Sequence, residues 1–243
     1  MSTSLGSHRT SGAVVEGDPG SERWVRVGTS SAADPERAVQ EALAPILALG
    51  QPKLAILFGS PAHDLAVISR LVKQAVGDHE VIGCSSAGEL IRDHALSGGL
   101  LIWALGGEGF SVTTGFGQGS VEQGLRQAAA DAAHCLDQLE RRHHTLLFLL
   151  ADGLCGDQME VVRGAYEVCG ARVPLMGACA GDDMALQSTR QIHEDRVLTH
   201  AVVAAAISSD APMAIGIAHG WKPLSEPMLV TESHGTKIGR AHV

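Results

Sequence analysis

VPLMGACAGDD, residues 173–183, is the stretch that indicates the fold, because a short apolar strand runs into a Gly-rich turn that ends on two carboxylates. VIGCSSAGEL, residues 81–90, has the same order of an apolar strand, a cysteine, an Ala-Gly pair and an acid. A strand that stops at glycines and presents a carboxylate is a common way for α/β proteins to build a ligand site. The two turns are therefore the first candidates for a binding site.

The segments around these turns alternate between strands and helices. LAILFGS at 54–60 and TLLFLLAD at 145–152 are continuously apolar, which is typical of strands buried on both faces of a parallel sheet. Asp34, followed by proline, and Asp157, with a glutamate three residues on, are typical first residues of helices. This alternation predicts an α/β fold with mixed, mainly parallel sheets and flanking helices.

The order strand–helix–strand–helix–strand–turn–strand occurs twice along the chain. The two copies cover about residues 23–107 and 108–221, and they predict an internal duplication of a β-α-β-α-β-turn-β unit. Strands are expected within 196–207 and at 213–221, and a hairpin at 228–238. The alternative is that two similar α/β units arose by chance, because residue identity between the halves is low.

The domain is expected to span residues 23–238, with tails at both ends. Residues 1–22 are rich in Ser and Gly, lack the apolar core of a signal peptide and are expected to be disordered. Residues 239–243 are expected to form a short tail. The five cysteines contain no CxxC pair, which favours reduced thiols and a cytoplasmic protein.

Composition excludes several classes of partner. The net charge of −9 and the aromatic content of 3% argue against binding to nucleic acid or to an anionic membrane surface. No apolar run is long enough to span a membrane. The twelve histidines show no metal-ligand spacing, so no metal is expected. GFGQGS at 115–120 falls short of the dinucleotide fingerprint, and no cofactor is predicted.

Acidic residues close three strands of the predicted sheet. Glu89 and Asp182 end the two Ala-Gly turns, and Asp152 with Gly153 closes the strand 145–152. Parallel strands would bring these acids to one edge, where carboxylates beside backbone amides suit the ammonium and carboxylate groups of a free amino acid. The alternative is that each acid caps its own loop through bonds to backbone N–H groups.

The run Cys84-Ser85 raises the alternative of nucleophilic catalysis. A hydrolase or transferase could use either side chain at the strand end. However, GCSSA lacks the second glycine of G-x-S-x-G, no strong helix follows and no base can be named. A cysteine in this position is more often a small buried residue. A third hypothesis is a ligand-free interaction module in which the acids are purely structural.

Several motifs together resemble the N-terminal half of the FIST family, the sensory domains of signal-transduction proteins. In chain order these are GCSSAGEL (83–90), LADGLCG (150–156), VPLMGACAGDD (173–183), STRQIHEDRV (188–197) and HGWKPLSEPMLVTESHG (219–235). The resemblance implies a bacterial cytoplasmic sensor, not an enzyme, that binds an amino acid or a similar small polar metabolite. Family members continue into a C-terminal half that these residues do not contain, so a separate C-terminal half or a signalling protein is an expected partner.

The resemblance also implies a set of ligand-binding positions, each of which lies in one of the shared motifs. These positions are Cys84, Ser85, Gly88, Glu89, Asp152, Gly153, Gly181, Asp182, Trp221 and Thr231. Trp221, at the end of the predicted strand 213–221, could cover a small ligand, although core packing is the commoner role of tryptophan. No catalytic set is implied.

Overall fold

The computed structural model describes residues 23–91, 94–120, 124–218, 220–224, 226–234 and 237–242. The expected disorder of residues 1–22 concerns a segment outside this range. The helices are α1 (Pro35–Leu47), α2 (Leu65–Val76), α3 (Arg126–Ala133), the 3-10 helix η1 (His134–Asp137) and α4 (Gln158–Cys169). The strands are β1 (Trp24–Ser30), β2 (Pro52–Gly59), β3 (Glu80–Ser85), β4 (Glu89–Ile91), β5 (His94–Leu96), β6 (Leu100–Gly106), β7 (Phe110–Gln118), β8 (His144–Ala151), β9 (Leu175–Cys179), β10 (Gln191–His193), β11 (Arg196–Leu198), β12 (Ala201–Ser209), β13 (Leu229–His234) and β14 (Lys237–His242).

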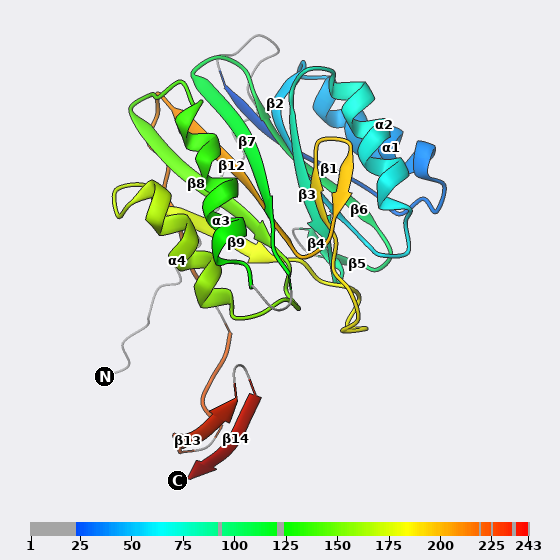
Figure 1. Ribbon diagram of the computed structural model, residues 1–243. Helices are drawn as coiled ribbons and strands as arrows, with labels where there is room; N and C mark the ends of the chain where they lie inside the picture. Colours follow the sequence, from blue (N-terminus) through cyan, green and yellow to red (C-terminus); the bar gives the residue numbers. More distant parts are fainter. Residues whose placement is uncertain are drawn as a thin grey trace, which may run out of the picture.

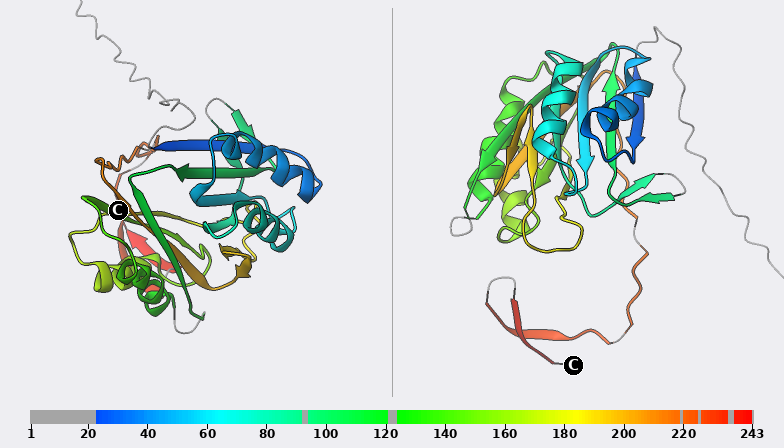
Figure 2. Two further views of the ribbon diagram at one scale, coloured as in Figure 1. Left: turned by 90° about the horizontal axis from the view of Figure 1, so that it is seen from above. Right: turned by 90° about the vertical axis from the view of Figure 1, so that its right-hand side faces the viewer.

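Two sheets pack face to face, and a pair of helices covers the outer face of each (Figure 1). One sheet has the strand order β1-β6-β2-β3-β10-β11 and lies under α1 and α2. The other, β7-β12-β8-β9, lies under α3 and α4, as both turned views also show (Figure 2). The prediction of an α/β fold with mixed sheets and flanking helices is confirmed. The sequence did not decide between one main sheet and two, and the described residues form two main sheets together with the two-stranded sheets β4–β5 and β13–β14.

Four strands of each sheet follow the same plan. In the first half β1 pairs antiparallel with β6, β6 antiparallel with β2, and β2 parallel with β3. In the second half β7, β12, β8 and β9 pair in the same order and directions. Within the described residues, parallel pairs occur only between β2 and β3 and between β8 and β9, which is fewer than expected. The reason is that β6 and β12 return beside the first strand of their own half and run antiparallel to both neighbours.

The small hairpin β10–β11 joins the sheet of the other half. β10 follows β9 in sequence but pairs antiparallel with β3, where Gln191 lies opposite Cys84. β9 belongs to the four-stranded sheet, whereas β10 pairs with β3 in the six-stranded sheet. The loop between β9 and β10 therefore passes from one sheet to the other. This crossing brings the turn after β9 to the turn after β3.

Three apolar clusters hold the layers together. One lies between α1, α2 and the first sheet, and a second between α3, α4 and the other sheet. The third, which includes Ile56, Ile82, Leu150 and Val203, lies between the two sheets. The middle of each sheet is therefore buried on both faces, which explains the continuous apolar runs in the sequence.

The C-terminal part of the chain differs from its prediction. Residues 213–218 and 220–221, expected as a strand, are extended but form no sheet ladder within the described part of the chain. A strand needs a neighbour for its backbone groups, and no described strand pairs with this segment. The hairpin expected at 228–238 is present as β13–β14, which stands away from the two-sheet body (Figure 1). β14 continues through His242.

Candidate functional site

The turn after β3 and the turn after β9 are joined directly, although they belong to different sheets. The Ser85 hydroxyl donates to the Gly181 carbonyl oxygen at 2.6 Å, and the Gly181 N–H donates to the Ser85 carbonyl oxygen at 3.0 Å. A Cβ on residue 181 would lie 2.9 Å from the Ala87 nitrogen, so a glycine is needed for this close approach. The two turns that stand out in the sequence thus form one structural unit.

Asp182 organises the loop that follows β9. Its carboxylate accepts the backbone N–H groups of Gln187 at 2.7 Å, Leu186 at 2.9 Å and Ser188 at 3.0 Å, and its side chain is buried. The bond from Gln187, followed by those from Leu186 and Ser188, lowers the pKa of Asp182, although partial desolvation opposes the shift. Both carboxylate oxygens are used inside the loop.

Asp152 ties together three loops. Its Oδ1 accepts the Leu154 N–H at 2.9 Å and the Thr189 hydroxyl at 2.8 Å, and its Oδ2 accepts the His200 N–H at 3.0 Å. The side chain is only 3% exposed. A buried carboxylate with three donors is a stable arrangement, since the donors replace the lost hydration. It leaves no oxygen without a protein donor.

Glu89 has the same function in the turn after β3. Its carboxylate accepts the Ser86 hydroxyl and, at 3.2 Å, the Gly99 N–H, and it is 3% exposed. Gly88 precedes it with a φ of 105°, a conformation that favours glycine. Glu89, Asp152 and Asp182 are therefore all hydrogen-bonded within the protein. This geometry is the one that the loop-cap alternative describes.

Asp183 differs from these three acids because its side chain is exposed. It accepts the Ser60 hydroxyl, from the end of β2, through Oδ2 at 2.8 Å, and its own N–H donates to the Ser86 carbonyl oxygen at 3.2 Å. Its φ of 53° is left-handed, which an aspartate tolerates better than most residues. No described residue donates to Oδ1. Asp183 thus presents a free carboxylate oxygen where the ends of β2, β3 and β9 meet.

His63 lies in the loop that leads from Ser60 to α2. Its side chain is 7% exposed, and its Nε2 makes no hydrogen bond to any described residue. A buried ring nitrogen without a partner is uncommon and is often satisfied by water or a ligand. Neither Ser60 nor His63 is among the positions predicted to bind a ligand. The signal in the sequence is that Ser60 ends the buried strand 54–60 and His63 follows it three residues later.

The chemistry of Cys84 and Ser85 does not favour a nucleophile. Burial, together with the nearby Cys179, raises the pKa of Cys84 to about 12, and its side chain is 3% exposed. The Ser85 hydroxyl donates to Gly181 and accepts the Arg190 N–H at 2.9 Å, so its bonds go to the backbone and not to a base. Burial also raises the pKa of the exposed Cys179 thiol.

The remaining proposed positions fall into two groups. Gly153 lies at the joined turns, because a Cβ there would be 2.5 Å from the Ala180 carbonyl oxygen. Trp221 is 87% exposed in the extended segment after β12, and Thr231 is exposed in β13, away from the two-sheet body (Figure 1). The structure therefore brings eight of the ten positions together and leaves Trp221 and Thr231 apart.

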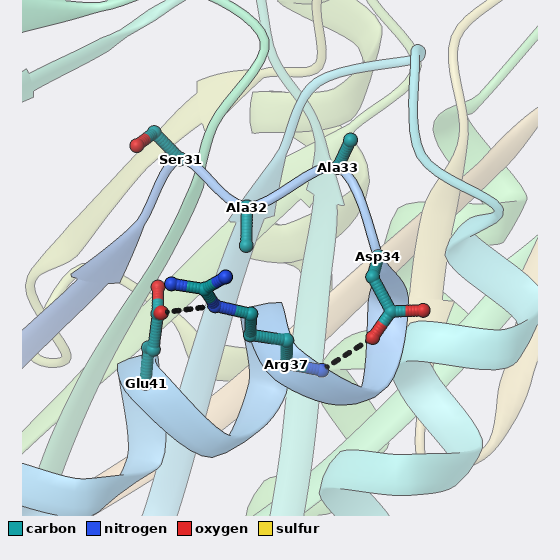
Figure 3. Close-up of a pocket in the computed structure, with 6 residues that line it drawn as sticks. All are labelled: Ser31, Ala32, Ala33, Asp34, Arg37 and Glu41. Carbon is teal, nitrogen blue, oxygen red and sulfur yellow. Dashed lines mark hydrogen bonds and ion pairs between the residues drawn. The ribbon is translucent and has the colours of Figure 1, made fainter.

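A hollow of about 290 Å³ lies at the start of α1, apart from the joined turns (Figure 3). The Asp34 carboxylate accepts the Arg37 N–H at 2.9 Å, and the Arg37 Nε donates to Glu41 at 2.7 Å. Ser30, the last residue of β1, and Gly59, the last residue of β2, both pair with Leu100 of β6. β1 and β2 therefore end at the same edge of the sheet, and the hollow after β1 lies at the edge where the joined turns also lie. Its lining is Ser31, Ala32, Ala33, Asp34, Arg37 and Glu41.

The sequence model of the FIST N domain matches residues 53–240, more than three quarters of the chain. The chain belongs to the FIST family. The match includes β2, both joined turns, the Asp152 loop and the C-terminal hairpin, but not β1 and α1. FIST is a family of sensory domains in signal transduction, which confirms the resemblance seen in the motifs.

No curated protein sequence matches this FIST domain significantly. Within the described residues no helix has the length and apolar character that a membrane-spanning helix requires.

Proposed function

We propose that this FIST domain is a small-ligand sensor and not an enzyme, and that its ligand is an amino acid or a similar small polar metabolite. The site we propose is the edge where the ends of β2, β3 and β9 meet. The residues that shape it include Cys84, Ser85, Gly88, Glu89, Asp152, Gly153, Gly181 and Asp182. Of these, Glu89, Asp152 and Asp182 would position the loops, and ligand contact would fall to exposed groups beside them.

The observation that carries this proposal is the exposed carboxylate of Asp183. Ser60 donates to its Oδ2, while its Oδ1 accepts no hydrogen bond and forms no ion pair within the described residues. A fixed carboxylate at a strand end suits a ligand ammonium group, since a charge-assisted hydrogen bond is about twice as strong as a neutral one. The buried Nε2 of His63, in the loop that starts at Ser60, is a further polar group in this region that accepts or donates no hydrogen bond within the described residues.

The properties of Cys84 and Ser85 support binding over catalysis. A thiol with a pKa near 12 is almost entirely protonated at neutral pH, and the thiolate is the nucleophilic form. The Ser85 hydroxyl holds two strand ends together, so catalysis would have to break that contact. A sensor needs a well-ordered rim of this kind to transmit binding to the rest of the fold.

We further propose a cytoplasmic location and a signalling protein, or a separate C-terminal half of the family, as the partner. The five cysteines lie unpaired in the structure, which fits a reducing compartment. Membership of a sensory family supports an output partner, because a sensor acts through a protein that carries its signal onward.

A thermal-shift screen tests the ligand proposal. Amino acids would be compared with matched compounds that lack the ammonium group, and a ligand at 100 times its Kd should add about 2.7 kcal/mol to the free energy of unfolding. Asp183→Asn should remove the shift but keep the unliganded Tm, because the Asn carbonyl can still accept from Ser60. Asp78→Asn, on an exposed turn after α2, is the matched control and should bind normally. A folded protein that shifts with no compound would contradict the proposal.

A further inference from the structure

The described residues of 211–242, here called the C-terminal arm, expose an unusual amount of apolar surface. Ile217 is 92% exposed, Trp221 87% and Leu224 101%, and Leu229 and Ile238 are also exposed. Single exposed apolar residues are ordinary, but a contiguous series of large ones marks a surface that binds a partner. Figure 1 shows the arm leaving β12 and ending in the separate hairpin β13–β14.

The two-sheet body has an open strand edge at β9, and the residues around this edge are also apolar and exposed. In β9, which ends its sheet, Met176 is 39% exposed and the three residues after it are exposed as well. Leu147 N–H donates to Pro174 O at 3.0 Å, and Ala180 N–H donates to Ala151 O at 2.8 Å, so the even-numbered residues face β8. The alternation of a strand then turns the N–H and C=O groups of Gly177 and Cys179 outward, to the open edge.

The side chains around this edge are also apolar and uncovered. The Cys179 Sγ contacts Gln158 of α4, so Met176 and Ala178 point to the opposite face, which is the face between the two sheets. Met184 and Leu186, in the loop after β9, are 77% and 68% exposed. An open strand edge with apolar neighbours is a template for an added strand.

The first part of the arm has the sequence of such a strand. In PMAIGIA, residues 212–218, Met213, Ile215 and Ile217 share one face, and two alanines and Gly216 share the other. Met213 packs against the cluster between the sheets, which holds the start of the arm on its own body. Residues 214–218 follow it with no strand partner in the described chain, and their number equals the length of β9.

The arm has too little slack to reach β9 of its own body. β12 lies two strands from β9, and the place beyond β9 is about 14 Å away at a spacing of about 4.8 Å. The four residue steps from Ser209 to Met213 span at most about 14 Å when fully extended. The connection would also have to pass over the ends of two strands, and Met213 is already packed between the sheets.

We propose that residues 214–218 of one copy pair with the β9 edge of a second copy, and that the exchange is reciprocal. Each chain carries both the strand and the edge, so a twofold dimer buries both arms and both edges at once. Ile215 and Ile217 then lie against Met176 and Ala178 of the partner, and the rest of the arm covers Met184 and Leu186. The joined turns, which follow β9, lie next to the exchanged strand.

The oligomeric state of the protein in solution tests this proposal. Sedimentation velocity at increasing concentration should show a dimer for the wild-type chain. Ile217→Pro should give a monomer at the same concentrations, because proline removes an N–H and fits poorly in a paired strand. Leu224→Pro is the matched control: it replaces an exposed apolar residue of the arm outside the pairing segment, and should leave the dimer intact. A wild-type monomer, or a dimer that tolerates Ile217→Pro, overturns the proposal.

Amide hydrogen exchange separates the remaining alternative, in which the arm folds back on its own β9. In the wild-type dimer the Gly177 and Cys179 amides should exchange at least tenfold more slowly than in Ile217→Pro. Slow exchange of these two amides in a chain that sediments as a monomer overturns the exchange between copies. Equal exchange in wild type and variant also overturns it, since β9 would then be unpaired in both.

Discussion

Ser85 and Gly181 exchange two hydrogen bonds, of 2.6 and 3.0 Å, and so join the end of β3 in one sheet to the turn after β9 in the other. Because the chain between β9 and β10 crosses from one sheet to the other at this point, the contact fixes where two separately built halves meet. A ligand that moves the loop after β9 would therefore act on both sheets. This is a physical route from a small bound molecule to a change in the whole domain.

Removing the Ser85 hydroxyl should weaken this junction. Ser85→Ala leaves the Gly181 carbonyl without its donor and the Arg190 N–H without its acceptor in a buried place, and each unsatisfied group costs about 1–3 kcal/mol. We expect urea unfolding to show a loss of about 2 kcal/mol or more. Ser233→Ala, on the exposed hairpin, should change the free energy of unfolding very little. Equal stability of the two variants would show that the junction contributes nothing.

The close approach at Gly181 predicts a second loss of stability. In Gly181→Ala the new Cβ meets the Ala87 nitrogen at 2.9 Å and the Ala87 Cβ at 3.0 Å, so backbone has to shift, at a cost of about 1–3 kcal/mol. Gly220→Ala is the control, since no atom lies within 4 Å of its Cβ. Chemical denaturation of both variants measures the difference. A neutral Gly181→Ala would mean that the two turns can separate without strain.

The lowered pKa of Asp182 predicts a pH dependence with a definite sign. A carboxyl whose folded pKa lies below its unfolded value contributes stability above the unfolded pKa of about 3.9, and loses that contribution as pH falls through the folded pKa. The Tm of Asp182→Asn should therefore fall well below that of wild type at pH 7, and the two values should converge below about pH 4.

The matched comparison for that series is Asp78→Asn, which removes an exposed charge outside the loops. Its Tm should follow wild type across the same pH range. If Asp182→Asn instead keeps the wild-type Tm at pH 7, the three backbone donors would be satisfied by water, and the carboxylate would be free to serve a ligand.

Much of the architecture could be predicted from the sequence because the signals were local. The unbroken apolar runs at 54–60 and 145–152 gave buried strands, and Asp34 and Asp157 accept the N–H bonds expected of helix caps. The number of sheets and the neighbours of β6 and β12 could not be read, because pairing depends on contacts far apart in the chain. The segment 213–221 has the residue pattern of a strand, but no described strand pairs with it. The residue pattern of one segment does not reveal whether a pairing partner lies beside it.

The gathering of the acids could be predicted from the sequence, and loop capping was one of the two roles left open for them. The positions of Glu89, Asp152 and Asp182 at strand ends showed that they would gather, whereas their hydrogen-bond donors come from loops distant in sequence, such as Thr189 and His200 for Asp152. Asp183 could not be separated from Asp182 by sequence, since they are neighbours of the same type. Only the turn of the backbone buries one and exposes the other.

The cysteines give the last prediction, which separates a binding site from a catalytic one. With a pKa of about 12, only about one part in ten thousand of Cys84 is thiolate at pH 8, and its side chain is 3% exposed. Iodoacetamide should therefore modify Cys169 and Cys179 in the folded protein and leave Cys84 intact until denaturant is added, as peptide mass spectrometry would show. Cys169→Ser serves as the control, because it removes one of the two modified sites and Cys169 is not among the groups that raise the pKa of Cys84. Fast alkylation of Cys84 in the native state would contradict the structure at this strand end and would favour a reactive nucleophile over a ligand-binding turn.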